Sequence, residues 1–116
     1  MITEQTLPSA EAPSCCTTLT VQPLALDEAR EWARILKAVA DPTRLRLVSL
    51  VAANEGSEAC ACDLTAPVGL GQPTVSHHLK ILVDAGVLHR DKRGIWSYYS
   101  VTASTLEKLA AFLSPA

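Results

Sequence analysis

The chain has 116 residues, which is room for one domain. Hydrophobic residues make up 48% of it, charged residues 19% and aromatic residues 4%, so a compact and mainly aliphatic core is expected rather than disorder. The net charge of −2 argues against a protein that coats nucleic acid without specificity. Residues 1–31 carry −4 and the remainder carries +2, however, so site-specific DNA binding stays open.

Membrane and secreted classes are excluded next. No apolar run approaches the roughly 18–20 residues of a membrane span. The first 12 residues are acidic and lack the basic and apolar regions of a signal peptide. We therefore expect a cytoplasmic protein with no membrane partner, whose four cysteines are thiols available for metal or redox chemistry.

The chain is expected to consist of a tail and one domain. Residues 1–23 contain three prolines with serines and threonines between them and have no apolar period, which predicts a flexible N-terminal tail. This tail carries Cys15 and Cys16 side by side. Residues 24–116 are expected to form the folded domain.

Two helices are predicted at the start of the domain. Residues 26–40 place Trp32, Ile35, Leu36 and Val39 on one apolar stripe. A second helix is expected from Pro42 to about residue 54, because Asp41 can cap free amides and proline suits the first helical position. This helix is apolar nearly all round, which predicts a central position.

A short helix, a tight turn and a longer helix are predicted next. The short helix is expected over about 60–68 and is limited by Pro67, which removes one amide donor. Glycines at 69 and 71 favour a tight turn. The longer helix is expected over about 72–85, ends at Gly86 and buries a stripe of Val75, Leu79, Leu82 and Val83.

The apolar period then changes from helical to two. Residues 87–90 and 95–101 flank a turn at 91–94, which predicts a β-hairpin. A last helix is expected over about 102–113, with an apolar face of Leu106, Leu109, Ala110 and Leu113. This order of elements predicts a winged helix-turn-helix, an α+β fold that is mainly α with a β-hairpin wing.

In such a fold the helix over 72–85 enters the major groove of double-stranded DNA. Its residues off the apolar stripe suit that role, because glutamine pairs with an adenine edge and hydroxyl or basic groups meet phosphates. The candidate DNA contacts are Gln72, Thr74, Ser76, His77 and Lys80 on the helix, with Lys92 and Arg93 at the hairpin tip. The alternative for each is a solvated polar position on an exposed helix. A metal role for the pair His77–His78 is not expected, because consecutive helical residues point about 100° apart.

Three segments resemble the ArsR/SmtB family of metal-responsive repressors. They are residues 72–80 (Gln-Pro-Thr-Val-Ser-His-His-Leu-Lys), residues 37–45, and the wing ending Trp-Ser-Tyr-Tyr at 96–99. The resemblance covers roughly residues 27–113. It implies a homodimeric winged-helix repressor that binds an inverted-repeat operator and releases it when a metal binds.

The family's dimer interface uses its first and last helices. Carried over to this sequence, that interface comprises Trp32, Ile35, Leu36, Leu106, Leu109 and Leu113. The sequence departs from the family at Gly71, where a helix-capping serine is usual, and at Pro67 beside the cysteine motif. The family's zinc-type site on the last helix looks absent, because residues 102–116 offer only Glu107 as a ligand.

Cys60 and Cys62 match the Cys-x-Cys motif that arsenic-, cadmium- and lead-sensing members of the family carry at the start of the third helix. Amides at a helix start favour thiolates and are expected to lower the thiol pKa. Two thiolates seldom suffice. In one subgroup of the family the third sulfur lies a turn further on in the same helix, where this sequence has Thr65, and in other members N-terminal cysteines fold over this helix. The implied metal site is therefore Cys60 and Cys62 with one or both of Cys15 and Cys16.

An all-sulfur site selects soft ions. Trivalent arsenite or antimonite, which takes three thiolates, is the first expectation for the inducer, and cadmium or lead is the second. The alternative for Cys60 and Cys62 alone is buried apolar packing. Two rival functions stay open: a thiol redox-sensing repressor that uses the same cysteines, and a metal-sequestering protein that binds no DNA. An enzyme is not expected, because no acid is placed to orient His77 beside Ser76.

Overall fold

The structure, a computed structural model, describes residues 18–115 and divides the chain into two units. The central unit comprises residues 35–102, and the terminal unit comprises the segments up to Arg34 and from Ala103 onward. The elements in chain order are α1 (Leu26–Val39), α2 (Pro42–Ala53), η1 (Glu55–Ser57), β1 (Glu58–Cys60), η2 (Ala61–Asp63), α3 (Thr65–Val68), α4 (Gln72–Asp84), β2 (Leu88–Arg93), β3 (Trp96–Val101) and α5 (Ala103–Leu113).

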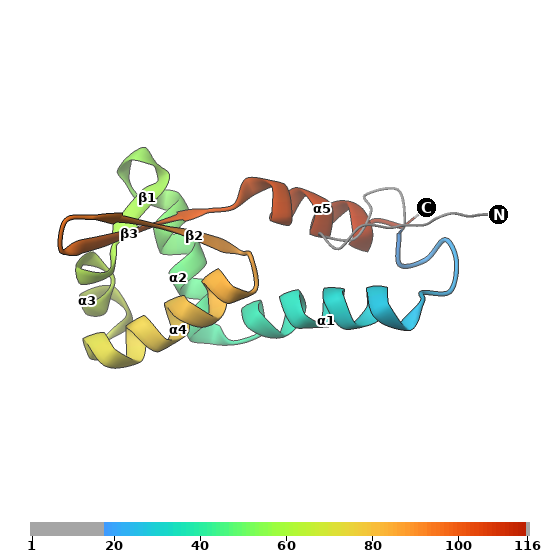
Figure 1. Cartoon of the computed structure of the whole chain (residues 1–116), viewed down its shortest axis with the longest axis horizontal. Helices are drawn as coiled ribbons and strands as arrows, with labels where there is room; N and C mark the ends of the chain where they lie inside the picture. The colour runs from blue at the N-terminus through green and yellow to red at the C-terminus, as the bar shows by residue number, and fades with distance from the viewer. Residues whose placement is uncertain (1–17, 116) are drawn as a thin grey trace. The chain divides into compact units, whose positions relative to one another are not determined.

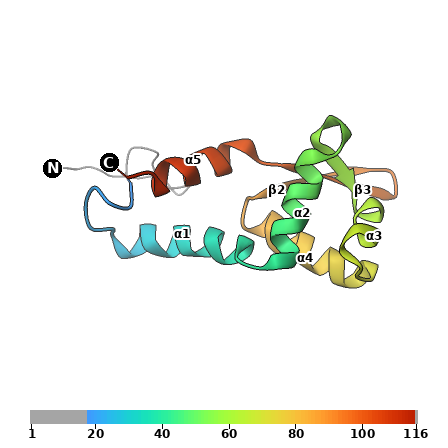
Figure 2. The same cartoon turned by 180° about the vertical axis from the view of Figure 1, so that it is seen from behind.

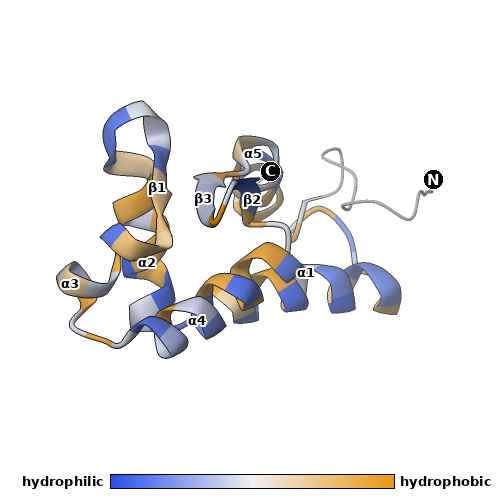
Figure 3. Ribbon diagram, turned by 60° about the vertical axis from the view of Figure 1, so that its left-hand side comes forward, coloured by the Kyte–Doolittle hydropathy of each residue, from blue (hydrophilic) through white to orange (hydrophobic). Residues whose placement is uncertain are grey.

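In the central unit, α2 and α4 pack against a three-stranded antiparallel sheet (Figures 1 and 2). α2 begins as predicted: an Asp41 carboxylate oxygen accepts the backbone N–H of Arg44 at 3.0 Å, and Pro42 follows the cap. The half of α2 nearer β1 is coloured hydrophobic in Figure 3, in keeping with its central position. The fold is therefore the predicted winged helix-turn-helix, with α3 and α4 as the helical pair and β2–β3 as the wing.

The predicted helix over 60–68 is wrong in its first half. Cys60 ends strand β1, residues 61–63 form the 3-10 turn η2, and the α-helical part is only Thr65–Val68. Pairing with β3 draws residues 58–60 into the sheet, because an edge of β3 is available to them. At the other end Gly69, at φ +70°, stops the helix with its N–H on the carbonyl of Thr65.

The wing differs from its prediction in the position of the turn. β2 and β3 pair from Leu88 opposite Val101 to Arg93 opposite Trp96, so the turn is Gly94-Ile95 and not residues 91–94. Gly94 has φ +65°, the left-handed backbone that two-residue hairpin turns need. Lys92 and Arg93 therefore end a strand, and Ile95 at the turn is 84% exposed.

The terminal unit is held by an aromatic stack. The rings of Trp32 on α1 and Phe112 on α5 lie 4.4 Å apart between centroids and are nearly parallel, and the backbone N–H of Leu19 donates to the carbonyl of Phe112. Phe112 is buried, although the predicted apolar face of this helix did not include it. Leu113, which that face did include, is 45% exposed.

Among the helices of the described residues, none is long and apolar enough to cross a membrane.

Leu79, in the middle of α4, gives the first test of the fold. Its side chain is wholly buried, so Leu79→Ala should lower the free energy of unfolding by about 2–5 kcal/mol. Leu45→Ala, which removes the same atoms from an exposed site on α2, should change it by less than about 1 kcal/mol. Urea unfolding followed by circular dichroism measures both. Equal losses would contradict the described orientation of α4.

Candidate nucleic-acid interface and thiol pair

The candidate DNA contacts on α4 lie on its exposed side. Val75, Leu79 and Leu82 are wholly buried, and this orientation leaves the predicted contacts, Gln72, Thr74, Ser76, His77 and Lys80, exposed. The first turn of the helix has no acidic residue, and Gly71 at its cap offers no side-chain acceptor. The exposed side of α4 is therefore open to an acceptor-rich partner such as a base edge or a phosphate.

His78 has a structural contact that the sequence pattern does not indicate. Its Nδ1 lies 3.0 Å from Nη1 of Arg44, whose Nε donates to the carbonyl of Ala38 at 2.6 Å. A guanidinium can only donate, so His78 accepts at Nδ1 and carries its hydrogen on Nε2. Arg44 thus connects α4 to the end of α1 and the start of α2. The backbone N–H of Arg44 also donates to Asp41, and this hydrogen bond is the main reason that the pKa of Asp41 is lowered.

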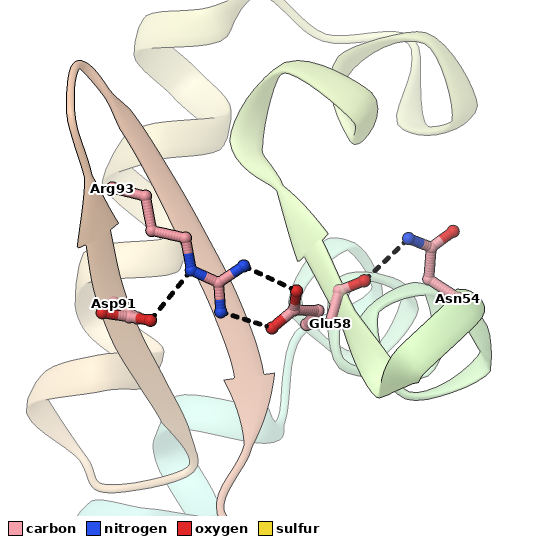
Figure 4. Close-up of polar contacts among 4 residues, drawn as sticks. All are labelled: Asn54, Glu58, Asp91 and Arg93. Atoms are coloured by element: carbon pink, nitrogen blue, oxygen red, sulfur yellow. Dashed lines mark hydrogen bonds and ion pairs between the residues drawn. The ribbon is translucent and has the colours of Figure 1, made fainter.

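Arg93 on the wing is already engaged within the protein. Its guanidinium donates to both carboxylate oxygens of Glu58 at 2.8 and 2.9 Å and to Asp91 at 3.0 Å, as Figure 4 shows, and it lies over the ring of Tyr98. The hydrogen bonds from Arg93 lower the pKa of Glu58, and these two acids raise the pKa of Arg93. Contact of Arg93 with DNA stays a prediction, and it would require the guanidinium to leave these partners.

The strand register separates the basic residues of the wing. Side chains alternate between the two faces of a strand, so Arg90 and Lys92 share one face of β2 while Asp91 and Arg93 share the other. Arg90 faces α4, because the two line one cleft of about 370 Å³. The cleft is formed by Ser76, Lys80, Val83, Asp84, Arg90, Ser97 and Tyr99. Arg90 and Ser97 were not among the sequence candidates; the period-two pattern gives their face, but only once the turn is correctly placed.

Cys60 and Cys62 lie together at the end of β1. The sulfur of Cys60 accepts the backbone N–H of Cys62 at 3.4 Å; Cys60 is buried and Cys62 is exposed. The hydrogen bond with Cys60 raises the pKa of the Cys62 thiol to about 11, and nearby Asp63 adds to the effect. The expectation of a lowered pKa is wrong for Cys62, because its backbone hydrogen bond lowers the pKa by less than Cys60, burial and Asp63 raise it.

The other predicted sulfur ligands, Cys15 and Cys16, lie outside the described residues. Between residues 18 and 115 the structure contains no cluster of three or more His, Cys, Asp or Glu side chains that could hold a metal ion. The described part of the site is thus a pair of thiols. Sulfur is the donor that soft ions prefer, so this pair fits a thiophilic ligand.

The predicted interface residues differ in exposure. Trp32 and Ile35 are buried within the chain, and Leu36, Leu106 and Leu109 are half-buried. Leu113 is the most exposed of the six.

Comparison with known proteins assigns the family. Residues 41–90 match the model of the bacterial regulatory proteins of the arsR family. An uncharacterized HTH-type transcriptional regulator of Methanocaldococcus jannaschii is 34% identical over 84 residues, which are 72% of this chain and 92% of that protein. The chain belongs to the arsR family. An arsenical resistance operon repressor of Staphylococcus xylosus is 37% identical over 78 residues, covering 67% of this chain and 72% of that repressor.

Solved structures agree with this assignment for the fold. NolR from Sinorhizobium fredii matches with a TM-score of 0.63 and 28% identity, over 78% of this chain and 90% of that one. A homodimeric winged helix-turn-helix DNA-binding domain from Mycobacterium bovis matches with a TM-score of 0.63 and 22% identity, over 78% and 84% of the two chains. As a member of the arsR family the chain is a DNA-binding transcriptional regulator and not an enzyme.

The pKa of Glu58 gives a test of the wing contacts in this arsR-family protein. Because Arg93 lowers that pKa in the folded state, the ion pair stabilises the fold at pH values above the ordinary pKa of glutamate, and the contribution is lost as pH falls through the lowered value. Glu58→Gln should therefore be less stable than the wild type at pH 7, with the difference shrinking toward pH 3. Urea midpoints from pH 7 to pH 3 measure this. A difference that is constant with pH would contradict the ion pair.

Proposed function

We propose that this chain is a transcriptional repressor that binds operator DNA as a homodimer and is released when arsenite or antimonite binds its cysteine thiolates. The observation that carries the proposal is the place of the thiol pair. Cys60 ends the third strand of the wing sheet, opposite Tyr98 of β3, and Cys62 follows in the segment that leads into the helix-turn-helix. A ligand on these sulfurs would act on both DNA-contacting elements.

DNA recognition in this proposal uses the exposed side of α4. Gln72 and Thr74 at its start would meet base edges, and Ser76, His77 and Lys80 would meet bases or phosphates. The wing would add a contact from Lys92, and one from Arg93 if its guanidinium leaves Glu58 and Asp91. Two such units related by a twofold axis would read half-sites about one helical turn apart.

The proposed dimer interface is formed by apolar residues of α1 and α5. Leu36, Leu106, Leu109 and Leu113 supply the partly exposed surface, and Trp32 and Ile35 support it from within the chain. Homodimer formation in the Mycobacterium bovis domain supports this part of the proposal.

Arsenite fits the sulfur set in its chemistry. Trivalent arsenic takes three thiolates, so Cys60 and Cys62 need a third sulfur, which we assign to Cys15 or Cys16. Binding exchanges the three hydroxyls of arsenous acid for three sulfurs, and each thiol proton leaves in a water molecule. The name of the Staphylococcus xylosus relative, an arsenical resistance operon repressor, supports this inducer over cadmium or lead.

A redox switch on the same cysteines is the less favoured alternative. The thiolate is the reactive form both in oxidation and in ligand exchange, so the raised pKa of Cys62 does not separate the two functions. The names of two relatives, both arsenical resistance operon repressors, favour ligand exchange with arsenite over peroxide sensing.

An arsenite titration tests the inducer. The wild-type protein should lose affinity for the duplex upstream of its own coding region by about 5- to 150-fold when arsenite is saturating, the usual size of a coupling between two sites. Cys62→Ser, at an exposed position, should keep the affinity without arsenite and lose the response. Fluorescence anisotropy of the labelled duplex measures both. Release by cadmium or peroxide with arsenite inert would replace the inducer, and loss of DNA binding in Cys62→Ser would indicate a structural role.

The number of sulfurs is tested separately. X-ray absorption at the arsenic edge of the loaded protein should give three sulfur neighbours and no oxygen neighbour. The double variant Cys15→Ser/Cys16→Ser should reduce the count to two and leave DNA affinity without arsenite unchanged. A count of three in that variant would overturn the assignment of the tail.

A further inference from the structure

The cleft between α4 and the wing has the chemistry of an anion site. Lys80 from α4 and Arg90 from β2 bring two cations to it, and Ser76 and Ser97 bring two hydroxyls. Oxyanions such as phosphate accept from all four of these groups. The cleft lies within the central unit and opens beside the exposed side of α4, where DNA is expected.

The cleft also contains an acid, Asp84, whose carboxylate lies 3.0 Å from the ammonium of Lys80. This ion pair contributes little to the stability of the helix. Asp84 is the last residue of α4, where the helix dipole disfavours a negative charge, and a lysine four residues before an acid is the weaker order for a helical pair. Both side chains are also well exposed, which makes the ion pair weak. The ion pair with Lys80 therefore contributes little to the stability of α4.

Arg90 is better placed than Arg93 to meet DNA in this cleft. Arg93 lies on the opposite face of β2 and is held by Glu58 and Asp91 (Figure 4). Arg90 faces α4 across the cleft, and no hydrogen bond or ion pair is described for its guanidinium within residues 18–115. Its five donors are thus available to an incoming phosphate.

We propose that this cleft binds a backbone phosphate of the DNA duplex through Arg90, Lys80 and the hydroxyls of Ser76 and Ser97, and that Asp84 competes with that phosphate for Lys80. The inference rests on the proposed DNA-binding function and adds Arg90, Ser97 and Asp84 to it. Arg90 strengthens DNA binding. Asp84 weakens it, because the carboxylate must give up Lys80 before the phosphate can take its place.

Arg90→Gln is the first test. A phosphate contact carries no sequence information, so the variant should bind the upstream duplex and a random duplex of equal length about three- to tenfold more weakly at 0.1 M salt. The slope of log affinity against log salt should fall by about 0.9, the contribution of one phosphate. Arg90→Lys should recover most of the affinity. Lys37→Gln, the same charge change at an exposed position on α1, is the matched control and should keep the wild-type slope.

Asp84→Asn is the second test, and its expected effect on DNA affinity is the opposite of that of Arg90→Gln. Loss of the competing carboxylate should raise the affinity for both duplexes by about two- to fivefold. Glu55→Gln removes an exposed acid from η1 and should leave the affinity near that of the wild type. Anisotropy titrations measure all variants, with thermal melts to show that each is folded.

The outcomes separate the two proposals. If the wild type binds the upstream duplex but Arg90→Gln matches Lys37→Gln, the phosphate site is overturned and the repressor function stands. If Asp84→Asn fails to exceed Glu55→Gln, the competition is overturned. If the wild type binds neither duplex, the proposed function fails first.

Discussion

Val75, Leu79 and Leu82 lie on one side of α4 and are wholly buried, which fixes the rotation of this helix about its own axis. With the rotation fixed, the polar residues between them must face outward, and the Arg44–His78 contact holds the helix to α1 and α2 at one point along its length. The sheet adds the second constraint, because β3 pairs with the wing strand β2 on one side and with the cysteine-bearing strand β1 on the other. The surface that we propose to meet DNA therefore depends on the packing beneath it.

The sharing of β3 also explains how a small ligand could influence a large surface. Cys60 is not on a loop that moves freely; its backbone pairs with Tyr98, and the carboxylate of Glu58 in the same strand is bonded to Arg93 of the wing. The Nδ2 group of Asn54, which caps α2, donates to the carbonyl of Glu58 (Figure 4). A displacement of β1 would thus shift the groups that it contacts in both α2 and the wing.

Much of the fold could be predicted from the sequence, because the strong signals are local. Asp41 and Pro42 mark the start of α2. The apolar residues of α4 and the glycine after it predict the bounds of that helix to within one or two residues. β1 could not be predicted: three residues are too few to show a period, and their strand conformation comes from pairing with a segment about 40 residues away. The wing turn was misplaced because a charged segment before a glycine suits a turn, yet Gly94 alone supplies the required φ.

For the candidate site, too, local signals could be predicted and long-range contacts could not. The exposed residues of α4 came from its period, whereas the partners of Arg93 and the cleft residues Arg90 and Ser97 depend on a strand register that the misplaced turn had shifted. The raised pKa of the Cys62 thiol could not be predicted either, because it comes from the hydrogen bond with Cys60 and from burial, which only the folded arrangement provides.

The order β1-β3-β2 makes β2 an edge strand, and its sequence from Arg90 to Arg93 is four charged residues in succession. An open edge invites another strand to pair with it, and charge along the edge is how natural sheets prevent that. These four charged side chains discourage the wings of neighbouring molecules from joining edge to edge, and the three basic ones among them also favour attraction to nucleic acid.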